Sequence, residues 1–178
     1  MDILNYIFGA AFVATIAAFL IYWLIVPILT TPFFISSIKD MLATFELAKL
    51  QSTDRMVDLG SGDGRVVLAA SRVCDYAEGV EINPFLTLFA RFMAVISANG
   101  SLRFKNQDFW QVDLSSFDVV FIYLSPSSLW KLKLKLAKEL QSGTRIVSHS
   151  FKIKGWNAVD TIKVGKKTHY LYIMGQQT

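Results

Sequence analysis

Hydrophobic residues fill the first part of the chain without interruption by charge. No charged side chain occurs from Ile3 to Ile38, and the segment Ile7–Leu29 within it has 23 residues. A helix rises about 1.5 Å per residue, so about 20 residues are needed to cross a bilayer core of about 30 Å. A secretory signal peptide would have a basic region before a shorter apolar run, and a buried core helix would have a polar stripe. The pattern therefore predicts a transmembrane helix within residues 1–30.

The remainder of the chain alternates between the periods of helices and strands. Ser37-Ile-Lys-Asp40 has the form of a capping box that opens a helix reaching about Leu50. From Arg55 onward, short apolar strands alternate with helices, and the last two strands form a hairpin around Gly165. The pattern predicts strands at 56–59, 79–82, 102–105, 117–124, 144–148, 160–164 and 169–174, and helices at 65–72, 84–99 and 128–140. This alternation indicates a doubly wound α/β sheet.

Composition and charge narrow the class of protein. The chain has 178 residues, a formal net charge of +4, 53% hydrophobic residues and 18% charged residues. That length fits one domain, the apolar content excludes a disordered chain, and the single cysteine, Cys74, excludes a disulfide scaffold. The positive charge is too diffuse to indicate nucleic acid. Lys39 follows the apolar run and no basic residue precedes it, so the positive-inside tendency places the body of the protein in the cytoplasm.

The strongest chemical signal is a glycine-rich loop between a predicted strand and a predicted helix. It reads Val57-Asp58-Leu59-Gly60-Ser61-Gly62-Asp63-Gly64-Arg65. Glycines allow a tight turn, close approach to a ligand and presentation of backbone amides at a helix N-terminus. A dinucleotide-binding loop would read G-x-G-x-x-G and a P-loop would end in G-K-[ST], and neither pattern is present. The loop therefore disfavours NAD, FAD and ATP hydrolysis.

Three acidic residues stand at the ends of three successive predicted strands. Asp58 lies just ahead of the loop, Glu81 ends the second strand and Asp108 follows the third. Asp58 suits a cationic ligand better than a polyphosphate. A carboxylate at the position of Glu81 can accept hydrogen bonds from both hydroxyls of a ribose, and one at Asp108 can accept a hydrogen bond from an exocyclic amine. Together they predict a pocket for an adenosyl ligand with a positive centre.

With these motifs the chain resembles the seven-β-strand S-adenosylmethionine-dependent methyltransferases. Within them it is similar to the small membrane-anchored lysine methyltransferases that modify the ATP synthase c-subunit and the adenine nucleotide translocase. The resemblance covers about residues 31–156. Beside the glycine-rich loop it rests on Thr31-Pro32-Phe33, Gly79-Val80-Glu81-Ile82-Asn83-Pro84, Asp108-Phe109, Tyr123-Leu124-Ser125-Pro126, Gly143–Phe151 and Trp156.

The resemblance implies an α/β fold, a Rossmann-like seven-stranded class I methyltransferase sheet with an N-terminal transmembrane helix. It divides the chain into an anchor (1–30), a pre-catalytic helical element (31–52) and a methyltransferase domain (53–178). The implied reaction moves a methyl group from S-adenosylmethionine to a lysine of a membrane-associated protein, with the ATP synthase c-subunit as the type of acceptor. The cofactor-binding residues would be Asp58, Gly60, Ser61, Gly62, Asp63, Gly64, Glu81, Asn83, Asp108 and Phe109.

The catalytic residues that the resemblance implies are Tyr123, Pro126 and His149. A lysine must be neutral to attack, and its unperturbed pKa is about 10.4, so desolvation or a nearby base must help. Tyr123 and His149 are the candidates for that base. Each residue also has a structural interpretation. For Tyr123, a role as a wall of the acceptor channel is as well supported as a catalytic role. For His149, a structural role at the end of a strand is better supported than a catalytic one.

Two further classes of function remain open. One is a membrane-bound methyltransferase of a small or lipophilic molecule, and the other is a non-catalytic module that binds S-adenosylmethionine. The fold does not distinguish them. We expect a single-pass membrane protein whose catalytic domain faces the cytoplasm. Its expected partners are the bilayer and a membrane-protein substrate, with no nucleic acid and no metal.

Overall fold

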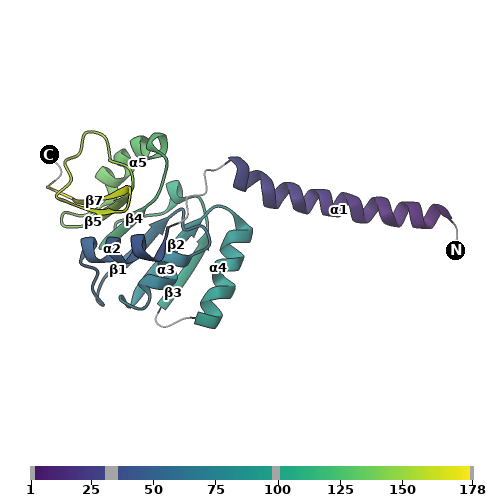
Figure 1. Cartoon of the computed structure of the whole chain (residues 1–178), viewed down its shortest axis with the longest axis horizontal. Helices are drawn as coiled ribbons and strands as arrows, with labels where there is room; N and C mark the ends of the chain where they lie inside the picture. The colour runs from purple at the N-terminus through teal and green to yellow at the C-terminus, as the bar shows by residue number, and fades with distance from the viewer. Residues whose placement is uncertain (1–2, 31–35, 98–100, 177–178) are drawn as a thin grey trace. The chain divides into compact units, whose positions relative to one another are not determined.

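In the computed structural model, which describes residues 3–30, 36–97 and 101–176, seven strands form one mixed sheet (Figure 1). The strand order is β3-β2-β1-β4-β5-β7-β6. The first five strands run parallel, and β7 pairs antiparallel with both β5 and β6. The strands are β1 (Arg55–Leu59), β2 (Tyr76–Glu81), β3 (Ser101–Asn106), β4 (Val119–Ile122), β5 (Arg145–His149), β6 (Asp160–Val164) and β7 (Lys167–Ile173). This arrangement confirms the predicted Rossmann-like seven-stranded sheet.

Helices cover both faces of the sheet. They are α2 (Ile38–Ala48), α3 (Arg65–Ala70), α4 (Pro84–Ser97), the 3-10 helix η1 (Phe109–Gln111) and α5 (Pro126–Glu139). Successive strand residues point to opposite faces, so Met56 belongs to a core shared with α2, α3 and α4, while Val57 belongs to a core shared with α5. Burial on both faces explains why the central strands read as continuous apolar runs.

Capping residues set where two helices begin. The backbone N–H of Asp40 donates to Ser37 Oγ (3.2 Å) and the backbone N–H of Ser37 donates to Asp40 Oδ2 (3.2 Å), which confirms the predicted capping box of α2. Helix α5 begins at Pro126, two residues before the predicted start at Ser128, because Ser125 caps it and proline is pre-organised for the first helical position. Strand β4 is correspondingly shorter than the predicted 117–124.

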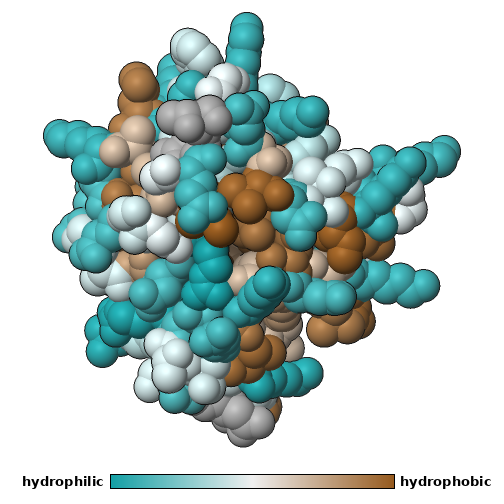
Figure 2. Space-filling model, turned by 90° about the vertical axis from the view of Figure 1, so that its left-hand side faces the viewer, coloured by the Kyte–Doolittle hydropathy of each residue, from teal (hydrophilic) through white to brown (hydrophobic). Residues whose placement is uncertain are grey.

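The exposed surface of α5 is mixed, because Trp130 (58% exposed) and Leu134 (73% exposed) stand on it beside lysines. Figure 2 looks onto the left-hand side of Figure 1 and shows hydrophilic side chains over most of that face, with hydrophobic ones in separate groups. Lys131 and Lys138 of α5 are exposed. Lys135 is different, because its ammonium pairs with Glu139 one turn later (2.7 Å) and its side chain is only 10% exposed.

The N-terminal unit requires a correction to the predicted anchor. The chain divides into Met1–Phe33 and Phe34–Thr178, and the first unit contains helix α1 (Ile3–Thr30), of which side chains are described at residue 3 and from residue 5 to residue 21. A bilayer crossing requires about 20 consecutive apolar residues in one helix. Within the described part of the chain, no helix has both the length and the apolar content for such a crossing.

The prediction of a transmembrane helix was therefore wrong on this finding, and so was the predicted single-pass membrane localisation. The expectation of the bilayer as a partner depended on the same helix. Two other sequence features, Thr31-Pro32-Phe33 and the end of the helix at Asn99-Gly100, lie outside the described residues.

Candidate functional site

The glycine-rich loop links the end of β1 to the start of α3. The backbone N–H groups of Gly60 and Ser61 both donate to Val80 O (2.9 and 3.0 Å), which fixes the loop against β2. Gly64 has φ +80°, and a Cβ there would lie 2.7 Å from both Ala90 Cβ and a ring carbon of Phe104. Position 64 therefore requires glycine because the loop packs closely against α4 and β3. The sequence alone did not show this reason.

The Glu81 carboxylate is held in place by two backbone N–H groups, one from the glycine-rich loop and one from the turn after β2. The N–H of Gly62 donates to its Oε2 (3.0 Å) and the N–H of Asn83 donates to its Oε1 (2.8 Å). These bonds orient the carboxylate at the carboxyl end of β2, beside the loop that follows β1. In open α/β sheets, ligands bind outside the carboxyl ends of the strands. Glu81 and the glycine-rich loop therefore lie together at the edge of the sheet where ligands bind.

The region around Asp58 carries concentrated negative charge. Burial, with the neighbouring carboxylates of Glu81 and Asp63, raises the pKa of Asp58 to about 7. The hydroxyl of Ser61 is buried and has no hydrogen-bond partner among the described residues. A buried carboxyl group with two other carboxylates nearby attracts a cation. A buried hydroxyl without a partner is available to form a hydrogen bond with a polar ligand. These acidic and hydroxyl groups thus fit an adenosyl ligand with a positive centre.

The other predicted cofactor residues have partners within the chain. Asp63 forms an ion pair with Arg65. Asn83 Oδ1 accepts the N–H of Phe85 (2.9 Å) at the start of α4. Asp108 Oδ1 accepts the N–H of Trp110 (3.1 Å) and so caps η1, where the ring of Phe109 packs against that of Trp110 at 4.9 Å. All stand near the carboxyl ends of β1, β2 or β3, and their contacts position the loops there.

The predicted catalytic residues gather at the carboxyl ends of β4 and β5. Tyr123 directly follows β4, and its ring lies 3.8 Å from the ring of His149, centroid to centroid. Pro126 is the first residue of α5. Burial, together with His169, lowers the pKa of His149 to about 4, although Asp40 opposes this shift. His149 is therefore neutral at pH 7.

Asp40, Lys167 and His169 are residues of this region that sequence reasoning did not single out for chemistry. Burial alone would raise the pKa of Asp40, but hydrogen bonds from the side chain and backbone of Ser37 and from Lys167 lower it to about 2. The sequence showed Asp40 only as part of a capping box. Its proximity to His149 and His169 arises from the packing of α2 on β5 and β7.

Known proteins resemble the chain over a part that includes the glycine-rich loop, Glu81 and His149. The sequence model of the ANTKMT methyltransferase domain matches residues 58–160. A protein-lysine N-methyltransferase of Saccharolobus islandicus (strain REY15A) is 39% identical over 147 residues, which is 78% of this chain and 90% of that protein.

Two mouse proteins also match. The ATP synthase c-subunit lysine N-methyltransferase of Mus musculus is 35% identical over 123 residues, 68% of this chain and 50% of that protein. The adenine nucleotide translocase lysine N-methyltransferase of the same species is 40% identical over 121 residues, 66% of this chain and 52% of that protein. The chain therefore spans about half the length of these two relatives.

A solved structure matches the fold. It is that of an RNA methyltransferase from Salinibacter ruber in complex with S-adenosyl-L-homocysteine, with a TM-score of 0.78 and 33% sequence identity. The match covers 82% of this chain and 96% of that one. Its ligand is the demethylated form of S-adenosylmethionine, the cofactor that the glycine-rich loop and Glu81 predict.

Proposed function

Because the chain belongs to the ANTKMT methyltransferase domain family, we propose that it methylates a lysine side chain in a protein of the ATP synthase c-subunit or adenine nucleotide translocase type. The chain is an S-adenosylmethionine-dependent methyltransferase. The observation that carries the proposed acceptor chemistry is the 39% identity to a protein-lysine N-methyltransferase across 90% of that protein. The acceptor type comes from the two mouse relatives.

The cofactor site that we propose combines the loop with the strand ends beside it. The carboxylate of Glu81, held by the N–H groups of Gly62 and Asn83, would accept the ribose hydroxyls. Asp58 would face the positive part of the cofactor, and Asp108 with Phe109 would hold the adenine. When bound, S-adenosylmethionine supplies an electrophilic methyl group on a positively charged sulfur.

The acceptor side that we propose lies at the ends of β4 and β5. Methyl transfer to an amine depends mainly on the orientation of the two reactants. The rings of Tyr123 and Phe151, 6.5 Å apart between centroids, would form an aromatic wall with Pro126 that desolvates the incoming amine. Desolvation lowers the pKa of an amine and so favours its neutral, nucleophilic form. His149 would position Tyr123 through its ring contact.

The raised pKa of Asp58 predicts how cofactor binding depends on pH. Below pH 7 the carboxyl group of the free enzyme is mainly neutral, and above it the group is mainly charged. Because the charged form attracts a cation, we expect the affinity for S-adenosylmethionine to rise by about three- to tenfold between pH 6 and pH 8. Calorimetric titrations at several pH values measure this change. Asp58→Asn should remove this pH dependence of the affinity. If the affinity of the variant changes with pH as that of the unmodified chain does, Asp58 is not the cause of the dependence.

The acceptor is tested by following a labelled methyl group. The full chain is incubated with methyl-labelled S-adenosylmethionine and with ATP synthase c-subunit, adenine nucleotide translocase or total RNA. We expect label in the protein acceptors, recovered as methyllysine after hydrolysis. Acceptors whose lysines were blocked by prior acetylation should take up no label, and Glu81→Ala enzyme should transfer none.

Other outcomes would point to other functions. Label confined to RNA would favour the activity that names the Salinibacter ruber relative. Label confined to small or lipophilic molecules of a membrane extract would favour the alternative methyltransferase. Cofactor binding without transfer to any fraction would favour a binding module. Each of these results would contradict the proposed lysine acceptor.

A further inference from the structure

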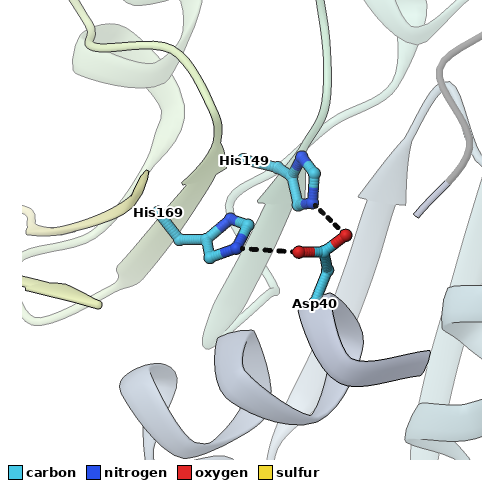
Figure 3. A group of neighbouring side chains, drawn as sticks. All are labelled: Asp40, His149 and His169. Atoms are coloured by element: carbon cyan, nitrogen blue, oxygen red, sulfur yellow. Dashed lines mark ion pairs between the residues drawn. The ribbon is translucent and has the colours of Figure 1, made fainter. Parts of the chain in front are cut away.

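Three buried side chains from separate elements meet beside the end of β5 (Figure 3). Asp40 lies in the first turn of α2, His149 is the last residue of β5, and His169 belongs to β7. The antiparallel register of β5 and β7 places His149 opposite His169. One ligand atom from each residue lies within 4.8 Å of the other two. Asp40 and His169 also lie outside the residues that the family model matches.

Three of the four histidine nitrogens of this cluster have no hydrogen-bond partner among the described residues. His169 is 0% exposed, and neither its Nδ1 nor its Nε2 has a hydrogen-bond partner among the described residues. The same holds for Nε2 of His149, which is 5% exposed. These Nε2 atoms face Asp40, at 3.3 Å from Oδ1 and 3.7 Å from Oδ2, respectively, and the contacts are ion pairs when the imidazoles are protonated (Figure 3). Buried polar groups without partners are costly and rare, so an occupant is expected.

The surrounding contacts leave three atoms available for that occupant. His149 Nδ1 lies 3.1 Å from Ser150 Oγ, and a hydrogen bond donated there leaves Nε2 with its lone pair. Asp40 Oδ2 accepts from the N–H and hydroxyl of Ser37 (3.2 and 2.8 Å) and from Lys167 Nζ (3.2 Å). Asp40 Oδ1 receives none of these bonds. Outer contacts that orient ligands in this way are typical of metal centres.

We propose that Asp40 Oδ1, His149 Nε2 and His169 Nε2 bind a divalent first-row transition-metal ion such as Zn²⁺. Two imidazoles and one carboxylate form a donor set that such ions prefer, whereas Mg²⁺ and Ca²⁺ prefer oxygen alone. With metal–ligand distances of about 2.0–2.1 Å, neighbouring ligand atoms of a tetrahedron lie about 3.3 Å apart. His169 Nε2 and Asp40 Oδ1 are already 3.3 Å apart. The ion would join α2 to β5 and β7.

Lys167 competes with this ion for Asp40. Its ammonium lies 3.2 Å from Oδ2, and its side chain is 37% exposed, so it can turn outward to solvent. A bound dication would be repelled by the ammonium at its present position. Removing the charge with Lys167→Met should therefore tighten metal binding while all three ligands stay. A purely structural cluster, in which the lysine only neutralises Asp40, would not gain metal affinity from this change.

The test titrates the metal-free full chain with Zn²⁺ in a calorimeter, with Mg²⁺ as the reference ion and Co²⁺ absorption spectra as a second readout. We expect one equivalent of Zn²⁺ to bind with a Kd on the order of micromolar or tighter, and Mg²⁺ not to compete. His169→Ala should lose this binding, and Lys167→Met should strengthen it about tenfold. Zn²⁺ should also raise the Tm of the unmodified chain and leave that of His169→Ala unchanged.

Several results would overturn the site. Absence of stoichiometric Zn²⁺ binding in both the unmodified chain and Lys167→Met would contradict the proposed site. Binding that survives in His169→Ala would place the metal elsewhere. If His169→Ala does not fold, His169→Gln keeps most of the volume without the imidazole and must likewise lose the ion. Lys167→Met alters a partly exposed side chain that is not one of the three ligands, so it decides the question independently of both histidine variants.

Discussion

Replacing Glu81 with alanine is expected to weaken binding of S-adenosylmethionine by about 10²- to 10³-fold and to abolish methyl transfer at ordinary cofactor concentrations. The change removes the carboxylate proposed to accept the ribose hydroxyls. It also removes the acceptor of the N–H groups of Gly62 and Asn83, which lie 3.0 and 2.8 Å from it. The loop would then lose its attachment to the end of β2. Calorimetric titration with S-adenosylmethionine and S-adenosylhomocysteine measures both affinities.

Two variants separate the ribose contact from the attachment of the loop. Glu81→Gln keeps one carbonyl oxygen for a backbone N–H but loses the charge, so we expect an intermediate loss. Glu46→Ala makes the matched change at an exposed glutamate of α2 and should bind the cofactor as the unmodified chain does. Unchanged affinity in Glu81→Ala would contradict the proposed cofactor site, whereas a loss in Glu46→Ala would indicate damage to the fold.

Gly64→Ala is expected to destabilise the fold by about 2–5 kcal/mol. A Cβ at this position would lie 2.7 Å from Ala90 Cβ and from Phe104 Cε1, and the residue has φ +80°, where side chains are strained. Either α4 or β3 would have to move away from the loop. Thermal or denaturant unfolding followed by circular dichroism measures the loss, which should lower the Tm by roughly 5–15 °C.

Gly143→Ala is the matched control for that variant. Gly143 has φ +91°, so alanine there meets the same backbone strain, but nothing lies within 4 Å of its Cβ position. We expect a cost of only about 1–2 kcal/mol. Similar losses in the two variants would mean that strain, and not close packing of α4 and Phe104, explains the glycine at position 64.

The central parallel strands agree with the prediction because strands covered on both faces are marked by dense apolar runs. The edge strands β3 and β6 are mostly exposed and lack such runs. The boundaries that differ have local causes, such as the cap at Ser125 that starts α5 early. The predicted membrane helix failed for a different reason. The sequence argument rested on the length of an uncharged run, but no helix of the described residues satisfies the length and hydropathy requirements together.

The sequence alone determined the sheet, the glycine-rich loop and the acid at the end of β2, because each depends on residues that are neighbours in the chain or repeat at a fixed period. Only the tertiary structure decided what Gly64 packs against and which atoms orient Glu81. It also brought Asp40, His149 and His169 together. These three residues share no local pattern, and the packing of α2 on an antiparallel strand pair alone sets the distances between them. The proposed metal centre depends on atoms that meet across the fold, and no single segment of the chain encodes those contacts.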